Sequence, residues 1–365
     1  MRDFTQLKRL VIKIGTSTIS SGQTVNSERI TSFAADINQL FRQGREIVIV
    51  TSGAIGMGAK LLGLSERPVD IRMRQACAAI GQPLVMDAYR QAFEPYKINI
   101  AQLLLTADVL NRRSTYLNLR HVFEKLFELK VIPIVNENDC VSTEEIGTAF
   151  GDNDRLSAYV ASKIDAGLLI LLSDIDGFYD RDPRCDPTAQ KINTVFAISK
   201  EIEAAAGAKG SSLASGGMQT KLEAARIAAR AGCKMVLADG SRPHVVQEIL
   251  EGKPIGTLFL PRQRLSQRER WIVNSNPRGR IIIDVGALAA LRQKKSLLPA
   301  GIKEVQGEFA SGEVVWLNDV AKAVSSFSSA ELKLLLGKHS TEIVRVLGAG
   351  KKDVVASPEN IVFLD

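Results

Sequence analysis

Histidine and cysteine are scarce in this chain of 365 residues, which contains three histidines and four cysteines. A zinc site is not expected, because so few histidines accompany cysteines that form no Cys-x-x-Cys pair: Cys77, Cys140, Cys185 and Cys233. We expect buried or inert thiols. No apolar run approaches the roughly 20 residues that cross a bilayer, and the N-terminus lacks a signal-peptide core. These absences predict a cytoplasmic protein with no membrane span.

The phosphate-binding motif G-x-x-x-x-G-K-[ST] is also absent, which argues against a P-loop enzyme. A strong charge of one sign is lacking as well. The net charge of +7 is distributed as +2 over residues 1–261, +3 over residues 262–275 and +2 over residues 276–365. Because no domain-sized segment is strongly basic, the composition gives little support for general nucleic-acid binding.

Residues 1–260 show a regular alternation of apolar runs and amphipathic runs. Continuous apolar runs such as residues 168–172 suit central strands that are buried on both faces. We expect strands at 10–14, 47–51, 98–105, 131–135, 168–172, 235–238 and 257–260. We expect helices near 27–43, 70–92, 115–129, 152–164, 218–231 and 243–250. This alternation predicts an α/β fold, a three-layer αβα sandwich with a largely parallel sheet.

The character of the sequence changes after Pro261. Residues 262–275 are polar and basic, as in a linker, and short apolar runs separated by glycine turns follow from about residue 276. One helical stretch, 329–336, interrupts these runs. The sequence therefore predicts a first domain of residues 1–261, a basic linker of residues 262–275, and a small β-barrel-like domain of residues 276–365.

Two lysines about 200 residues apart stand in turns made of small residues. Lys13 precedes the turn Gly15-Thr16-Ser17 after an expected strand, and Lys221 closes the run from Ser215 that opens an expected helix. Backbone N–H groups at such turns can face an anion, and a lysine adds the positive charge that a transferring phosphoryl group needs. The alternative interpretation is that both are ordinary surface lysines.

Polar turns follow further expected strands. Ser52-Gly53, Asn136-Glu137-Asn138-Asp139 and Ser173-Asp174 each come directly after one. Ligands of open α/β sheets lie beyond the carboxyl ends of the strands, so we expect these turns to meet at one crevice. Ser52 can donate to a carboxylate or phosphate, and residues 136–139 can bind a substrate ammonium. The alternative interpretations are a tight helix-entry turn for Ser52-Gly53, a hydrogen-bonded turn for residues 136–139 and a β-hairpin for the segment from Ser173.

The run Gly151-Asp152-Asn153-Asp154 precedes another expected helix. Asp152 or Asn153 alone could be a simple helix N-cap. Three polar residues together exceed what one cap needs. We therefore expect Asp154 to orient the two lysines by its charge while Asn153 binds substrate.

Taken in their order along the sequence, the motifs resemble those of the glutamate 5-kinases of the amino-acid kinase family. The resemblance covers nearly the whole chain, because residues from about 276 look like the PUA domain appended to many members. Aspartate kinases have Lys-Phe-Gly-Gly where this chain has Lys13-Ile14-Gly15-Thr16, and the His-Gly-Gly loop of acetylglutamate kinases is absent. Ser215 stands where the family commonly has Thr, a change that keeps the hydroxyl group.

The resemblance implies a role for each motif residue. Lys13 and Lys221 would stabilise the transferring phosphoryl group, and Asp154 would organise them. Ser52, Asp139 and Asn153 would hold L-glutamate. No metal ligand of the protein is implied, because Mg²⁺ would be held mainly by ATP. ATP itself would be held by Lys13, Ser173, Asp174, Ser215, Gly216, Gly217, Met218, Gln219, Thr220 and Lys221.

The reaction implied by the resemblance is ATP-dependent phosphorylation of the γ-carboxylate of L-glutamate, the first step of proline synthesis. That carboxylate, with an ordinary pKa of about 4.3, is already an anionic nucleophile at neutral pH, so no general base is required. The resemblance also implies inhibition by proline and a homo-oligomer, either a dimer or a tetramer. Because water destroys the acyl phosphate product, coupling to glutamyl-phosphate reductase is a further expectation.

The sequence leaves two alternatives open. Within the kinases, the phosphate acceptor could be a different carboxylate or a carbamate. From a different class, the chain could bind or modify RNA, because PUA-like modules commonly bind RNA. The first 260 residues and the near-neutral C-terminal domain argue against RNA binding as the main function.

Overall fold

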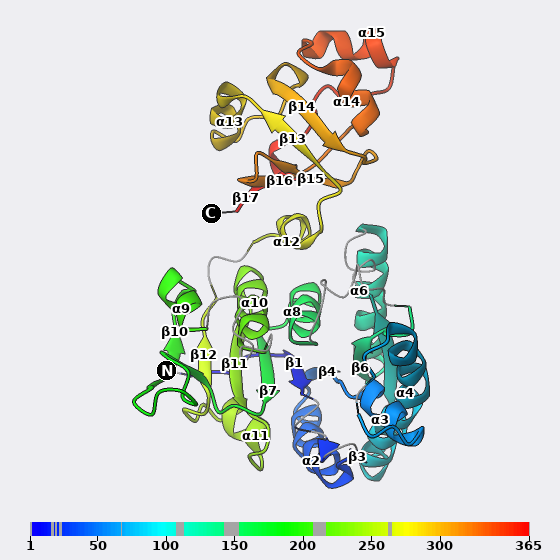
Figure 1. Ribbon diagram of the computed structural model, residues 1–365, viewed down its shortest axis with the longest axis vertical. Coiled ribbons are helices and arrows are strands. Elements are labelled where there is room, and N and C mark those ends of the chain that lie inside the picture. Colours follow the sequence, from blue (N-terminus) through cyan, green and yellow to red (C-terminus); the bar gives the residue numbers. More distant parts are fainter. Residues whose placement is uncertain are drawn as a thin grey trace. The chain divides into compact units, whose positions relative to one another are not determined.

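The computed structural model describes residues 2–15, 18, 20–21, 24–66, 68–106, 113–141, 153–206, 217–261 and 265–364. The chain forms two compact units, Met1–Arg264 and Leu265–Asp365 (Figure 1). All the residues that the sequence proposes for chemistry fall within the first unit.

The first unit is built on an eight-stranded sheet with the order β10-β12-β11-β7-β1-β4-β6-β5. Among its described strand pairs, β11 and β12 are antiparallel and the others are parallel. The seven expected strands are all present, whereas β10 is too short, at two residues, to stand out in the sequence. The strands are β1 (Arg9–Ile14), β4 (Glu46–Val50), β5 (Ile100–Leu105), β6 (Ile132–Glu137), β7 (Leu168–Ser173), β10 (Thr194–Val195), β11 (Lys234–Asp239) and β12 (Thr257–Phe259).

Helices cover both faces of this sheet, because alternate side chains of a strand point to opposite sides. In β1, Leu10, Ile12 and Ile14 belong to one apolar core and Val11 to the other. The core around Leu10 includes residues of α2 (Ser27–Arg42), α3 (Ala54–Leu61), α4 (Ile71–Phe93) and α11 (Val245–Leu250). The core around Val11 is lined by α6 (Arg113–Glu128), α8 (Asn153–Lys163), α9 (Lys200–Ala205) and α10 (Gly217–Arg230). The three-layer αβα sandwich with a largely parallel sheet is therefore confirmed (Figure 1).

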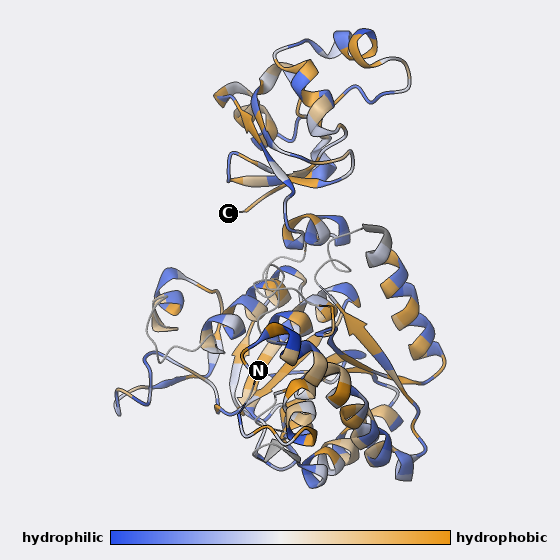
Figure 2. Cartoon of the chain, turned by 45° about the vertical axis from the view of Figure 1, so that its right-hand side comes forward, coloured by the Kyte–Doolittle hydropathy of each residue, from blue (hydrophilic) through white to orange (hydrophobic). Residues whose placement is uncertain are grey.

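The smaller elements among the described residues of the first unit are two hairpins and one turn of 3-10 helix. They are β2 (Ser20–Ser21) with β3 (Thr24–Val25), β8 (Phe178–Tyr179) with β9 (Lys191–Ile192), and η1 (Glu94–Tyr96). Figure 2 shows apolar strands enclosed by helices with hydrophilic outer faces. Among the described helices of the chain, none is both long enough and apolar enough to cross a membrane.

Strand register brings the carboxyl ends of β1, β4, β6 and β7 together. Lys13 of β1 lies between Val50 of β4 and Leu171 of β7. Beyond the strands, the N–H of Gly15 donates to the carbonyl of Leu172 at 3.2 Å, and that of Thr51 donates to the carbonyl of Val135 at 2.9 Å. The turns after these strands therefore start side by side, as the sequence predicts for a parallel sheet.

The second unit has a five-stranded sheet with the order β14-β13-β15-β16-β17 around its own apolar core. The strands are β13 (Gly279–Ile283), β14 (Ile302–Gly307), β15 (Val314–Leu317), β16 (Ala321–Val324) and β17 (Ile361–Phe363). Its helices are α12 (Gln267–Asn274), α13 (Val285–Arg292), α14 (Ser329–Leu335) and α15 (Ile343–Leu347), with single 3-10 turns η2 (Pro299–Gly301), η3 (Ser340–Glu342) and η4 (Pro358–Asn360). Of these helices, the sequence predicted α14.

Helix α12 falls within the stretch that the sequence suggests is a linker. Ser266 and Glu269 close its N-terminus with a capping box. Its residues from Arg270 to Val273 are buried. At its C-terminus, the buried ammonium of Lys322 donates to the carbonyls of Val273 at 2.7 Å and Ser275 at 2.9 Å. Arg268 and Arg270 of this stretch therefore belong to a helix of the second unit, whereas Arg262 and Arg264 lie outside the described residues.

Candidate active site

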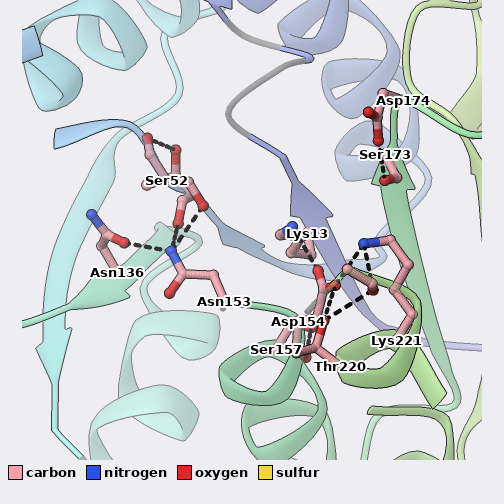
Figure 3. Close-up of polar contacts among 12 residues, drawn as sticks. Lys13, Ser52, Asn136, Asn153, Asp154, Ser157, Ser173, Asp174, Thr220 and Lys221 are labelled. Atoms are coloured by element: carbon pink, nitrogen blue, oxygen red, sulfur yellow. Dashed lines mark hydrogen bonds and ion pairs between the residues drawn. The ribbon is translucent and has the colours of Figure 1, made fainter. Parts of the chain in front are cut away.

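Asp154 stands between the two lysines that the sequence singles out (Figure 3). Its Oδ1 lies 2.6 Å from Nζ of Lys13, and its Oδ2 lies 3.0 Å from Nζ of Lys221. Lys13 comes from the end of β1, Asp154 from the first turn of α8, and Lys221 from the first half of α10. All three residues are buried. Ordinary surface lysines, the alternative interpretation, are therefore excluded.

The charges in this cluster do not balance, because two ammonium groups share one carboxylate. Burial alone would raise the pKa of Asp154, but the Lys13 and Lys221 ammonium groups outweigh it and hold that pKa below its usual value. The carboxylate is therefore ionised at neutral pH, and the three groups together carry a formal charge of +1. A buried positive charge at the end of a sheet attracts an anion, and a phosphoryl group is one.

Neighbouring groups fix the orientation of Lys221 and Asp154. Lys221 Nζ also donates to the carbonyl of Gly217 at 3.1 Å. The single proton of the Thr220 hydroxyl is shared between the same carbonyl at 3.0 Å and Asp154 Oδ2 at 3.3 Å. The hydroxyl of Ser157 donates to the backbone carbonyl of Asp154 at 2.6 Å. The first turns of α8 and α10 thus hold each other in place around the ion pairs.

Ser173 and Asp174 lie at the end of β7, apart from the Asp154 cluster in Figure 3. The Ser173 hydroxyl donates to Asp174 Oδ1 at 2.9 Å. The N–H of Gly240, which follows the adjacent strand β11, donates to the carbonyl of Ser173 at 2.8 Å. These contacts connect the turns after β7 and β11.

The expected ATP turn is only partly described. Ser215 and Gly216 lie outside the described residues, as do Thr16, Ser17, Gly151 and Asp152. Gly217 begins α10, Met218 packs against the core around Val11, and Gln219 is exposed. Thr220, expected to bind ATP, contacts Asp154.

A second group of polar residues surrounds Asn153 (Figure 3). Asn153 Nδ2 shares its two protons among three acceptors, the carbonyl of Thr51 at 2.5 Å, Asn136 Oδ1 at 2.8 Å and Ser52 Oγ at 2.9 Å. The turn after β4 and the end of β6 therefore meet at the first residue of α8, which brings Ser52 and Asn153 together. Asp139 is half-buried in the turn after β6, three residues beyond Asn136.

Two members of this group come from helix α4 and were not found from the sequence. Gln82 Oε1 accepts from Asn136 Nδ2 at 2.8 Å, and the hydroxyl of Tyr89 donates to Thr51 Oγ1 at 3.0 Å. Burial raises the pKa of Tyr89 to about 12 despite the bond to Thr51, so the phenol remains a donor. The sequence gives no distinct signal for them, because α4 also carries other polar residues, among them Arg74, Gln75 and Asp87.

The geometry gives two half-sites joined by helix α8. One offers two ammonium groups for negatively charged phosphoryl oxygens, and the other offers amide and hydroxyl groups for a small polar molecule. No group of three or more histidine, cysteine, aspartate or glutamate side chains among the described residues is arranged to hold a metal ion. Electrostatic positioning of two ligands is therefore the chemistry that this arrangement supports.

Comparison with known proteins agrees with this geometry. Residues 8–239 match the model of the amino acid kinase family, and residues 279–347 match that of the PUA domain. A glutamate 5-kinase of Methanosarcina acetivorans is 42% identical, with 99% of this chain and 97% of that protein covered. One from Thermus thermophilus is 43% identical, with 95% of each covered.

Among solved structures, carbamate kinase from Giardia lamblia bound to AMP-PNP has a TM-score of 0.50 and 16% sequence identity, with 70% of this chain and 99% of that chain covered. At that identity the likeness concerns the fold alone. The sequence relatives are far more similar, and they extend over both units. The chain therefore belongs to the amino acid kinase family, as a kinase of the glutamate 5-kinase group with a C-terminal PUA domain.

Proposed function

We propose that this protein transfers the γ-phosphoryl group of ATP to the γ-carboxylate of L-glutamate, giving L-glutamyl 5-phosphate, the first step of proline synthesis. The observation that carries the proposal is the placement of the buried Lys13–Asp154–Lys221 cluster next to the Asn153–Ser52 group. The relatives that match both units are named glutamate 5-kinases, which supports glutamate as the acceptor.

The chemistry requires two anions to approach each other. A γ-carboxylate is already ionised at neutral pH and needs no base, but it is repelled by the triphosphate. Lys13 and Lys221 reduce that repulsion and stabilise the charge on the phosphoryl oxygens as transfer proceeds. Asp154 pairs with both ammonium groups and aims them at one place, without itself touching the reacting atoms.

Each half-site binds one of the two substrates. Ser52, Asp139 and Asn153 bind glutamate, and the β7 end with Ser173 and Asp174 binds ATP together with the turn from Ser215 to Lys221. The Mg²⁺ ion enters with ATP as part of the substrate, which suits a site without a built carboxylate cluster among the described residues. Thr220, through its bond to Asp154, acts on the lysines as well as on the ATP turn.

Several wider properties belong to the same proposal. Residues 1–261 form the catalytic part, and the C-terminal domain regulates or assembles it. Proline inhibits by competing near the glutamate side, the protein acts as a homo-oligomer in the cytoplasm, and the unstable product passes to glutamyl-phosphate reductase. RNA binding by the PUA domain is a separate question, which filter binding at two salt concentrations answers.

The proposal is tested by an acceptor panel with hydroxylamine in the assay. Hydroxylamine attacks the acyl carbon of an acyl phosphate, releases phosphate and leaves a stable hydroxamate. L-Glutamate should give ADP and hydroxamate in equal amounts, whereas carbamate and other carboxylates give far less. ADP release that does not depend on glutamate, or a stronger response to another acceptor, would overturn the assignment.

A further inference from the structure

Helix α4 presents two buried polar side chains, Gln82 and Tyr89, to the residues around Asn153. They are seven residues apart, which is about two helical turns, so they lie on the same face of the helix. Both are buried, with exposed fractions of 7% for Gln82 and 1% for Tyr89. Burying polar groups on a core-facing side is unfavourable unless they form hydrogen bonds. The bond to Thr51 meets that need for Tyr89, and the bond to Asn136 meets it for Gln82 Oε1, whereas Gln82 Nε2 has no hydrogen-bond partner among the described residues.

The side-chain amides of Asn153, Asn136 and Gln82 are linked by hydrogen bonds. A backbone carbonyl determines which atom of each amide donates and which accepts. The carbonyl of Thr51 can only accept, so the atom of Asn153 that faces it must be Nδ2. Asn136 must then turn its Oδ1 to Asn153 and its Nδ2 to Gln82. Gln82 must therefore present Oε1 as the final acceptor.

Gln82 therefore determines whether the hydrogen bonds of Asn136 and Asn153 keep this direction. Without an acceptor at this position, Asn136 has nothing to hold its Nδ2, and its amide is free to rotate by half a turn. A rotated Asn136 would present a donor to the donor of Asn153, which is unfavourable. Asn153 would then lose one of the contacts that fix its own amide.

The same face of α4 holds the neighbouring turn from the other side. Tyr89 bonds to Thr51, and α4 packs closely on α3, which begins directly after Ser52-Gly53. A Cβ added at Gly58 of α3 would lie 1.9 Å from the carbonyl oxygen of Cys77 of α4. A movement of α4 would therefore shift the turn that carries Ser52.

We propose that Gln82 and Tyr89 are positioning residues, through which helix α4 fixes the orientation of Asn136, Asn153 and Thr51 and so shapes the pocket for the phosphate acceptor. This inference rests on the proposed function, because it assigns these residues to the glutamate side of that site. Neither residue touches the phosphoryl group, so their effect falls on acceptor binding rather than on ATP.

Two substitutions of Gln82 separate this role from simple packing. Gln82→Met keeps the length and shape of the side chain but removes the acceptor. Gln82→Glu keeps an oxygen acceptor for Asn136 Nδ2, whether the carboxyl group is charged or neutral. If Gln82 only filled space, Met would be the harmless substitution and Glu the damaging one. Our proposal predicts that Gln82→Met is the damaging substitution and Gln82→Glu the tolerated one.

The measurement is steady-state kinetics of the full chain with glutamate and ATP varied separately. Gln82→Met should raise the glutamate KM about tenfold, in line with the loss of one hydrogen bond and the rotation that follows. Its ATP KM should change less than about twofold, and Gln82→Glu should keep a glutamate KM within about threefold of wild type. Equal glutamate KM values for Gln82→Met and wild type, or a parallel rise in both KM values, would overturn the proposal for Gln82.

Tyr89→Phe provides a test that does not depend on the folding of Gln82→Met, because it removes one oxygen and keeps the ring. It should raise the glutamate KM about fivefold and leave the ATP KM unchanged. If Gln82→Met fails to fold, an unchanged glutamate KM in Tyr89→Phe alone overturns the proposal. If the wild-type protein does not phosphorylate glutamate, the proposed function fails instead, and the variants are compared on the acceptor that it does use.

Discussion

Asn153 and Asp154, consecutive residues in the first turn of α8, direct their side chains to two different groups of partners. Asn153 donates to Ser52 Oγ at 2.9 Å, while Asp154 faces Lys13 Nζ at 2.6 Å. Neighbouring positions on a helix point about 100° apart, so one helical turn can serve two sites at once. Because one peptide bond joins Asn153 to Asp154, the two half-sites have a fixed position relative to each other (Figure 3).

This arrangement predicts different kinetic effects from adjacent substitutions. Asn153→Ala removes contacts on the acceptor side, and it should raise the glutamate KM by about tenfold or more while changing the ATP KM little. Asp154→Asn disturbs the two lysines, and it should mainly lower kcat. Each variant serves as the control for the other in steady-state assays. If Asn153→Ala raised the ATP KM instead, the two half-sites would have been assigned to the wrong substrates.

The two lysines should act on the transition state rather than on substrate binding alone. Lys13→Ala or Lys221→Ala should each lower kcat by about 10²-fold or more, as expected when one preorganised electrostatic donor is lost. Lys125, which is exposed on α6, is a matched control whose replacement by Ala should leave kcat unchanged. Near-wild-type kcat in both active-site variants would disprove the assignment.

The lowered pKa of Asp154 gives a stability prediction with a definite sign. A carboxyl group whose pKa is lower in the folded state stabilises the fold above its unfolded-state pKa of about 3.9, and this contribution is lost as the pH falls through the folded pKa. Wild type should therefore exceed Asp154→Asn in unfolding free energy by a constant amount from pH 8 to about pH 5. The difference should shrink below about pH 4.

Urea unfolding of both proteins across this pH range measures that difference. At neutral pH it should reach about 3 kcal/mol, because Asn leaves two buried ammonium groups without their carboxylate. A variant as stable as wild type at pH 7, or a difference that grows toward acid pH, would contradict the electrostatic account of the cluster.

A shortened chain that ends at Pro261 tests the proposal that residues 1–261 form the catalytic part and that the C-terminal domain regulates or assembles it. Every side chain assigned to either half-site precedes residue 222, and α12 packs with the second unit, so the cut removes the second unit and only three residues of the first. The shortened protein should stay soluble and keep glutamate-dependent ADP formation, with kcat within about threefold of the full chain. A folded but inactive product would mean that the second unit supplies part of the active site.

The sequence predicted the sheet and the strand-end residues well, because both depend on short-range patterns. A continuous apolar run such as that of β7 suggests a buried strand, and parallel strands place their polar ends at one edge. Lys13 and Ser52 lie at such strand ends. Asn153, Asp154 and Lys221 lie near the starts of helices, and they were assigned to the same site from the polar and glycine-rich runs before those helices and from the resemblance to the glutamate 5-kinases.

Other features depend on tertiary packing that no local pattern reveals. Gln82 reaches Asn136 across 54 residues of sequence because α4 packs closely on α3, which in turn needs glycine at positions 58 and 81. The stretch containing Arg270 resembled a linker by its charge, but its buried side chains belong to α12. The role of Thr220 depended on the mutual arrangement of α8 and α10.

The measurement that tests the central claim most directly follows one oxygen atom. The γ-carboxylate of glutamate is labelled with oxygen-18, and the reaction with ATP is run in unlabelled water with hydroxylamine. If the carboxylate attacks the γ-phosphorus, a glutamate oxygen becomes the bridging atom of the acyl phosphate. Hydroxylamine then attacks the acyl carbon, and that oxygen leaves with the phosphate.

Mass spectrometry of the released inorganic phosphate gives the answer. The account predicts one labelled oxygen in each phosphate and one hydroxamate formed for each ADP, with both signals falling together in Lys221→Ala. Phosphate without label would show that water, rather than the glutamate carboxylate, receives the phosphoryl group. That result would contradict the proposed function at its reacting atom.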